Sequence, residues 1–142
     1  MATTAQFVAS PVIDITQIGP TGRTGGGTIG TDIFLVCSGP TFSGGSGVGK
    51  RITRGVIHGV SANSSGIVRF FLSPDSGTTR RIILEKPVYG TTVSATTSAY
   101  RTEIPELVGM VVPGVSGANA YQIYASTHVA DTYNIIIESG VL

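Results

Sequence analysis

The sequence predicts an all-β protein, an antiparallel β-sandwich with a jelly roll of about eight strands as the favoured topology. Three observations predict this fold class. The 142 residues include 20 glycines, 7 prolines and many serines and threonines, a composition that disfavours helices. Between the glycine-rich and proline-rich breaks lie short segments rich in β-branched and aromatic residues. Several of these segments alternate in hydropathy, and no helical period separates them.

Eight segments have the composition and length of strands: residues 32–38, 52–61, 66–73, 78–86, 91–102, 107–112, 119–126 and 132–138. In the second segment Val56 and Ile57 should point to opposite faces of a sheet, and in the seventh Ile123 and Tyr124 should do the same. We therefore expect one buried face and one solvent-exposed face in each. Between the third and fourth segments, Ser73-Pro-Asp-Ser-Gly77 has the residues of a tight hairpin turn.

Residues 1–30 are expected to form a flexible, glycine-rich N-terminal arm, and residues 31–142 a single β-sandwich domain, because a chain of this length has room for one core. Residues 19–27 contain five glycines, so one fixed conformation would be entropically costly. Residues 12–15 alternate, and we expect them to add a strand to a sheet edge of a neighbouring chain. A plain frayed terminus is the alternative.

The charge pattern argues against nucleic-acid and membrane partners. The net charge is +1, which creates no general attraction for polyanions. Arg80 and Arg81 must face opposite sides of a strand, and the other small basic group is Lys50, Arg51 and Arg54. Neither group is interleaved with aromatic residues, as a nucleic-acid groove would be. With no signal-peptide pattern and no long apolar run, we expect a soluble protein that is synthesised in a cytoplasm.

Motifs for cofactors and metals are weak. Residues 44–51, Gly-Gly-Ser-Gly-Val-Gly-Lys-Arg, approach the phosphate-loop pattern, but Arg51 replaces the hydroxyl residue that binds magnesium. A strand, residues 52–61, is expected next where the motif requires a helix. Cys37 is the single cysteine, so an internal disulfide is excluded and no zinc site is suggested. We therefore expect no cofactor and no metal.

No catalytic constellation stands out, and we do not expect an enzyme. His58 and His128 are the only histidines, and neither has a triad partner nearby in the sequence. The acidic residues are scattered over different turns and suggest no carboxylate pair. A small hydrolase would require one of these histidines to meet a carboxylate or a serine in the folded chain.

The order of several short motifs resembles a known family. Ala-Asn-x-x-Gly and Arg-x-Phe lie in residues 60–73, Pro-Val ends residues 78–88, and Ala-Ser-Thr and Thr-x-Asn-Ile lie in residues 121–137. In this order and with these surroundings, the chain resembles the small capsid decoration or cementing proteins of tailed bacteriophages. The resemblance covers most of the chain after about residue 55.

The resemblance implies a β-sandwich or jelly-roll subunit that binds the outside of an assembled shell and bridges neighbouring major capsid proteins. It also implies a homo-dimer or homo-trimer, located on the outer capsid surface of the virion. We expect the following residues to contact the shell or another subunit: Val12, Ile13, Asp14, Ile15, Arg51, Arg54 and Tyr100. Apolar strand residues are expected in the core or in subunit packing, namely Phe70, Ile82, Leu84 and Tyr121.

A second reading is a tail, baseplate or head-fibre module that adsorbs to host glycans. Such a module needs an exposed aromatic platform with polar neighbours. The candidates for this platform are Tyr121, Tyr124 and Tyr133.

Overall fold

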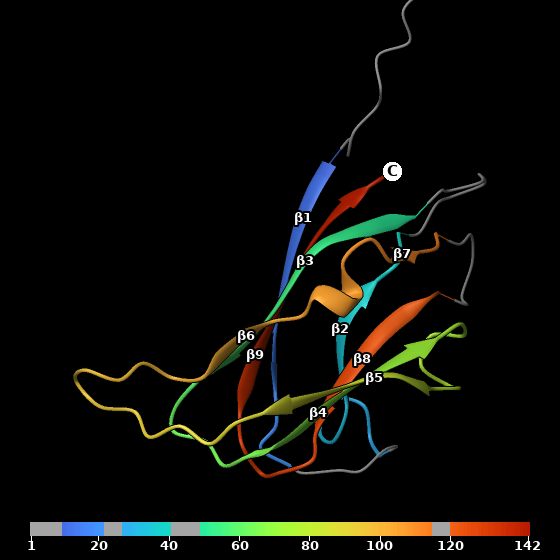
Figure 1. Ribbon diagram of the computed structural model, residues 1–142. Coiled ribbons are helices and arrows are strands. Elements are labelled where there is room, and N and C mark those ends of the chain that lie inside the picture. The colour runs from blue at the N-terminus through green and yellow to red at the C-terminus, as the bar shows by residue number, and fades with distance from the viewer. Residues whose placement is uncertain (1–9, 22–26, 41–48, 115–119) are drawn as a thin grey trace, which may run out of the picture.

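The computed structural model describes residues 10–21, 27–40, 49–114 and 120–142. These residues form two antiparallel sheets whose inner faces share one hydrophobic core, so the chain is all-β and sandwich-like (Figure 1). Sheet A contains, in spatial order, β1 (Ser10–Ile18), β9 (Tyr133–Val141), β3 (Lys50–Gly59) and β6 (Arg101–Glu103), with β7 (Val111–Val112) also paired to β3. Sheet B contains β2 (Phe34–Ser38), β8 (Gln122–Thr127), β4 (Gly66–Ser73) and β5 (Arg81–Val88). One short 3₁₀ turn, η1 (Pro105–Leu107), separates β6 from β7.

The antiparallel pairs are nested along the chain. Strand β4 pairs with β5, β3 with β6, β2 with β8 and β1 with β9. Two further pairings, β3 with β9 and β4 with β8, join these pairs into the sheets. In the described part of the chain, β1 therefore forms one edge of sheet A and β6 with β7 the other, and β2 and β5 form the edges of sheet B.

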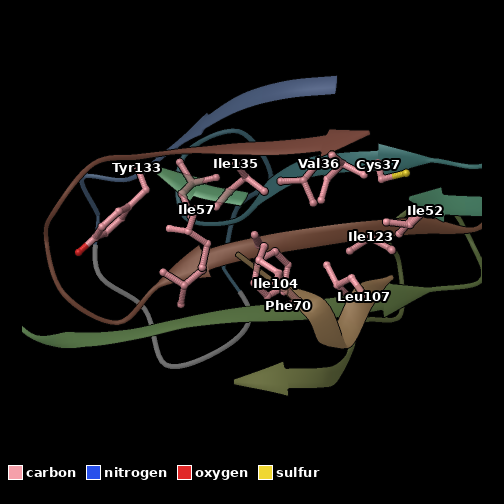
Figure 2. Close-up of a cluster of buried hydrophobic side chains, with 14 of the residues drawn as sticks. Val36, Cys37, Ile52, Ile57, Phe70, Ile104, Leu107, Ile123, Tyr133 and Ile135 are labelled. Carbon is pink, nitrogen blue, oxygen red and sulfur yellow. The ribbon is translucent and has the colours of Figure 1, made fainter. Parts of the chain in front are cut away.

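The core lies between the sheets and is aliphatic over most of its length (Figure 2). Ile57 on β3 and Ile135 on β9 are direct neighbours in sheet A, and both are fully buried. Phe70 and Ile123 reach the same cluster from sheet B. Burying one such side chain stabilises the fold by roughly 1.5 to 3 kcal/mol, so this cluster provides the main driving force for folding.

The predicted hairpin between β4 and β5 is present, but residues 74–80 connect the two strands, which is longer than the tight turn that the sequence predicts. The Ser73 hydroxyl donates to Asp75 Oδ1 over 2.9 Å and accepts from the Gly77 N–H over 2.8 Å. Asp75 Oδ1 also accepts from the Thr79 N–H over 2.7 Å, and this bond lowers the pKa of Asp75. The side chains at the end of β4 thus organise the turn that follows.

Two predicted strands are wrong over most of their length. Only the end of residues 91–102 is extended in a sheet, as β6, and residues 107–112 supply only the end of η1 and the two-residue β7. Residues 92–98 are exposed, and Ser94 and Thr97 close a local turn through reciprocal backbone hydrogen bonds. The β-branched threonines favour a strand only where a neighbouring strand is present to pair with them.

The expectation of one wet face in residues 52–61 and 119–126 is also wrong. Val56 and Ile57 are both buried, and β8 is buried on both faces from Ile123 to its end. In sheet B the cause is a second cluster, in which Ile33 packs with Phe71 and Tyr124 on the outer face. Residues preceding β2 therefore cover the central strands of sheet B.

Residues 10–18 form strand β1, which pairs along its whole length with β9 of the same chain. The expected strand at residues 12–15 is thus present, but at an edge of the chain's own sheet, where we expected it on a neighbouring chain. Its inner side reaches the core at Ile18, which is fully buried there. Residues 1–9 and 22–26 of the expected arm lie outside the described residues.

Residues 41–48, which include most of the phosphate-loop-like motif, also lie outside the described residues. Lys50 and Arg51 begin β3, so a strand follows the motif, as expected. A phosphate loop requires a helix at this point, whose N-terminal amides would bind the phosphate. The local structure after the motif therefore differs from that of a nucleotide-binding loop.

Candidate functional site

The most unusual surface in the described part of the chain is the outer face of β1. Ile13 and Ile15 point to the same side of the strand, and 62% and 66% of their surfaces are exposed. Val12, Asp14 and Thr16 alternate with them and are half-buried. Large aliphatic side chains next to each other on an edge strand are a feature of surfaces that bind another protein. Four of the seven sequence-predicted contact residues, 12–15, therefore lie on β1, and two of them, Ile13 and Ile15, form its exposed face.

Beneath β1 lies a pocket of about 170 Å³, at the seam where β1 and β2 approach each other. The Thr16 hydroxyl donates to the Leu35 carbonyl over 3.1 Å, and Lys50 Nζ lies 3.8 Å from Asp14 Oδ2. Cys37 lines the same pocket and is almost completely buried. Burial raises the pKa of the Cys37 thiol from 9.0 to about 11. The thiol is therefore protonated at neutral pH and is a poor nucleophile.

Arg51 and Arg54 both lie on β3, but their side chains have different surroundings. Arg51 is exposed, whereas Arg54 binds Glu103 over 3.0 Å and lies 3.7 Å from Glu138. Arg101 binds the same oxygen of Glu103 over 3.1 Å. Hydrogen bonding with Arg54 lowers the pKa of Glu103, and the same contact raises the pKa of Arg54. Glu138 pairs with Ile13 in the sheet register, so this group of ion-paired side chains extends to the exposed face of β1.

Tyr100 is half-buried and packs against the core, and its ring meets the ring of Tyr89 edge to face at 6.2 Å. Tyr89 is 64% exposed. The two tyrosines flank residues 90–99, which carry no charged side chain. Tyr89 was not among the sequence-predicted site residues, although it lies directly before Gly90, at a glycine break between two expected strands.

The tyrosines proposed for a glycan platform do not form one. Tyr133 and Tyr124 are buried, and burial raises the pKa of each. The Tyr133 hydroxyl accepts a hydrogen bond from the Asn63 amide over 3.0 Å, and the Tyr124 hydroxyl donates to Gln122. Tyr121 is half-buried against the core. The reason is that each of these rings packs against an apolar cluster, Tyr133 and Tyr121 against the main core and Tyr124 against Ile33 and Phe71.

The two histidines occupy separate places. His58 Nδ1 lies 2.8 Å from the carbonyl oxygen of Gly59, and His128 Nδ1 lies 2.8 Å from Arg69 Nη1. Arg69 in turn donates to Glu85 over 2.7 Å. The hydrogen bonds that the structure gives these rings are therefore to a backbone oxygen and to a guanidinium. A hydrolytic site would need a serine or a carboxylate at those positions.

Among the described residues, no cluster of three or more His, Cys, Asp or Glu side chains has the arrangement of a metal site. The same residues include no helix with the length and hydropathy that a membrane crossing requires. The geometry thus defines an all-β protein with two antiparallel sheets and, at β1, an exposed apolar edge. Comparison of the chain with protein-family models, with curated proteins and with solved structures finds no match.

Proposed function

We propose that this protein is a structural virion protein that binds the outer surface of a bacteriophage capsid and cements neighbouring major capsid proteins. The observation that carries the proposal is the exposed pair Ile13 and Ile15 on edge strand β1. A strand with this pattern gains stability when another protein covers it. The motif order described above points to a shell as the setting.

We also propose that the two sheets form a jelly roll. The nested pairs β4 with β5, β3 with β6, β2 with β8 and β1 with β9 support this topology, because a jelly roll is a long hairpin rolled into two sheets. Eight of the strands take part in these nested pairs, and β7 is an extra two-residue strand on β3. Viral capsid proteins and lectins use jelly rolls, so the topology is compatible with the proposal without deciding it.

The proposed partners are the major capsid protein and further copies of this chain, as a homo-dimer or homo-trimer. A protein that binds only the assembled shell stabilises it by mass action, so many weak contacts are sufficient. The near-zero net charge supports this arrangement, since crowded copies on a shell would repel each other weakly. The proposed location is the outer capsid surface.

The test mixes the purified protein with capsids that lack it, followed by imaging and by measurement of the capsid disruption temperature. We expect ordered density at repeated lattice positions and a higher disruption temperature. The matched variants Ile13→Lys and Ile82→Lys carry the same change on edge strands β1 and β5. If binding needs the β1 face, only the first variant should reduce occupancy. Absence of density on the lattice would contradict the proposal.

One observation favours the alternative function, a tail, baseplate or head-fibre module that binds host glycans. Tyr89 is exposed and is held edge to face by Tyr100, which is an arrangement that suits stacking on a sugar ring. Density restricted to the tail or to one vertex would support this alternative. Glycan binding that is lost in Tyr89→Ala and kept in Ile13→Lys would then identify the aromatic pair as the binding site.

A further inference from the structure

The edge strands of the described chain differ in how well they resist pairing with another strand, and β7, with two residues, is the shortest of them. Strand β2 has five residues and a register shift between Leu35 and Cys37, and β6 has three residues, of which Arg101 and Glu103 are charged. Strand β5 carries Arg81, Lys86 and Pro87. Short length, bulges, basic side chains and proline are the features by which proteins prevent edge-to-edge association.

Strand β1 has few of these features. It spans nine residues, pairs with β9 without a register shift and contains no Lys or Arg. Its proline, Pro11, is the second residue, and its one charged residue, Asp14, lies on the inner side beside Lys50. On the side away from β9, alternate residues of an edge strand present unpaired N–H and C=O groups. These groups lie next to the exposed Ile13 and Ile15.

We propose that two copies of this protein pair through β1, antiparallel about a two-fold axis, so that sheet A continues from one copy into the other. This inference takes from the proposed function only the expectation that copies of this chain associate with each other. A second copy is the fitting occupant because antiparallel pairing of one strand with itself makes each contact twice and matches the edges in length. The charges next to this edge are already balanced within each copy, by Asp14 with Lys50 and by Glu138 with Arg54.

The side chains of β1 select one register. In the pair, directly opposed side chains must lie on the same face of the sheet. Near the middle of the strand this leaves three registers, centred on Ile13, Asp14 or Ile15. The register that sets Ile13 opposite Ile15 of the other copy brings the two Asp14 carboxylates face to face, and opposed like charges destabilise a pair. The register centred on Ile13 uses Pro11, which has no N–H to donate. The register centred on Ile15 avoids both costs and pairs residues 12–18 of each copy.

The first experiment measures the oligomeric state of the purified protein by sedimentation velocity, without capsids. We expect a dimer for the native chain and an association at least about 30-fold weaker for Ile15→Lys, since two lysines would replace the two central isoleucines. The control Ile82→Lys places the same change on β5, where the native side chain is 49% exposed, and should dimerise normally. Because no shell is present, failure of shell binding and failure of pairing are separate results.

The second experiment tests the register by disulfide formation in a Cys37→Ala background. In the proposed register two Ile15→Cys side chains face each other at a distance that suits a disulfide, whereas two Ile13→Cys side chains are separated by several residues of strand. Mild oxidation should therefore give a covalent dimer at least about 10-fold faster for Ile15→Cys, a factor that follows from this geometry. A monomeric or trimeric native protein, an effect of Ile82→Lys equal to that of Ile15→Lys, or equal crosslinking of the two cysteine variants would overturn the proposal.

Discussion

Strands β1 and β5 are both sheet edges, and both expose isoleucines, yet their sequences differ in the accompanying residues. On β1, Ile13 and Ile15 are exposed with no basic side chain on the strand. On β5, the partly exposed Ile82 and Ile83 stand next to Arg81, and the strand ends in Lys-Pro-Val. The difference teaches that exposed apolar area alone does not mark an interface. An edge becomes a binding surface when the charges and prolines that block pairing are missing.

The two edges are also attached to the molecule in different ways. Strand β1 is held by nine pairs with β9 and by Ile18, which is fully buried in the core. Strand β5 pairs with β4 and buries Val88 at its end, but its other residues lie mostly exposed. Two of them reach neighbours through ion pairs, Glu85 with Arg69 at 2.7 Å and Lys86 with Glu106 at 3.0 Å. Apolar burial is worth more than exposed ion pairs, so β1 should be the more firmly anchored edge.

The largest expected effect tests this anchoring by truncation of one inner residue on each edge. Ile18→Ala should lower the free energy of unfolding by about 2 to 5 kcal/mol, because it leaves a cavity in the core. Leu84→Ala, at a half-buried position of β5, should cost less, about 1 to 2 kcal/mol. Urea unfolding of both variants measures the difference. A larger loss for Leu84→Ala would reverse the comparison of the two edges.

The second effect uses Cys37, which lines the pocket under β1 and reports whether this edge stays closed. Its pKa is raised from 9.0 to about 11, so between these two pH values the thiol is ionised in the unfolded chain and protonated in the folded chain. The stabilisation that comes from keeping this thiol protonated in the folded chain is therefore fully present below pH 9. It is lost as the pH rises toward 11, which lowers the free energy of unfolding by about 2 to 3 kcal/mol.

The measurement is the free energy of unfolding against pH for the native chain and for Cys37→Ala, which lacks this thiol. The difference between the two curves isolates the contribution of Cys37 from those of the other ionisable groups. At neutral pH the thiol should also react slowly with an aromatic disulfide reagent. Rapid reaction, together with parallel curves, would show that β1 does not cover Cys37 in solution.

The smallest effect concerns the ion pairs of the two edges. Glu85→Gln on β5 and Asp14→Asn on β1 each remove one charge from a pair, with Arg69 and Lys50 respectively. Each change should cost at most about 1 kcal/mol, since one partner of each pair is exposed to solvent by a third or more. Thermal unfolding at low and high salt checks this, because screening should remove most of the loss. A loss that persists in high salt would indicate lost packing instead.

Local sequence was sufficient where structure depends on local chemistry. The turn that begins at Ser73 was predictable because serine, aspartate and glycine organise it by their own hydrogen bonds. The prediction of a strand at residues 91–102 was wrong over most of its length, because a threonine-rich composition does not show whether a neighbouring strand is present to pair with it. Both cases had clear sequence signals, and only the second depended on contacts distant in the chain.

The candidate site shows the same division. The alternation of residues 12–15 was visible in the sequence and led to the choice of Ile13 and Ile15 as contact residues. Their neighbouring strand, β9, could not be predicted, because it lies more than a hundred residues away in the chain. From the sequence, Tyr121, Tyr124 and Tyr133 were the candidates for an exposed platform, and Tyr89 was not among them. Which aromatic residues are buried depended on Ile33 and on the core, neither of which is readable from a single strand.

The amino-acid sequence by itself determined that this protein is built from short antiparallel strands, because composition, alternation and turn residues act over a few neighbouring positions. Only the tertiary structure decided which strands form the edges and which faces are covered. Those outcomes follow from pairings between distant segments, β1 with β9 and β2 with β8, which bury some alternating faces on both sides and leave Ile13 and Ile15 in solvent. Burial belongs to the assembled sheets, and no single strand encodes it.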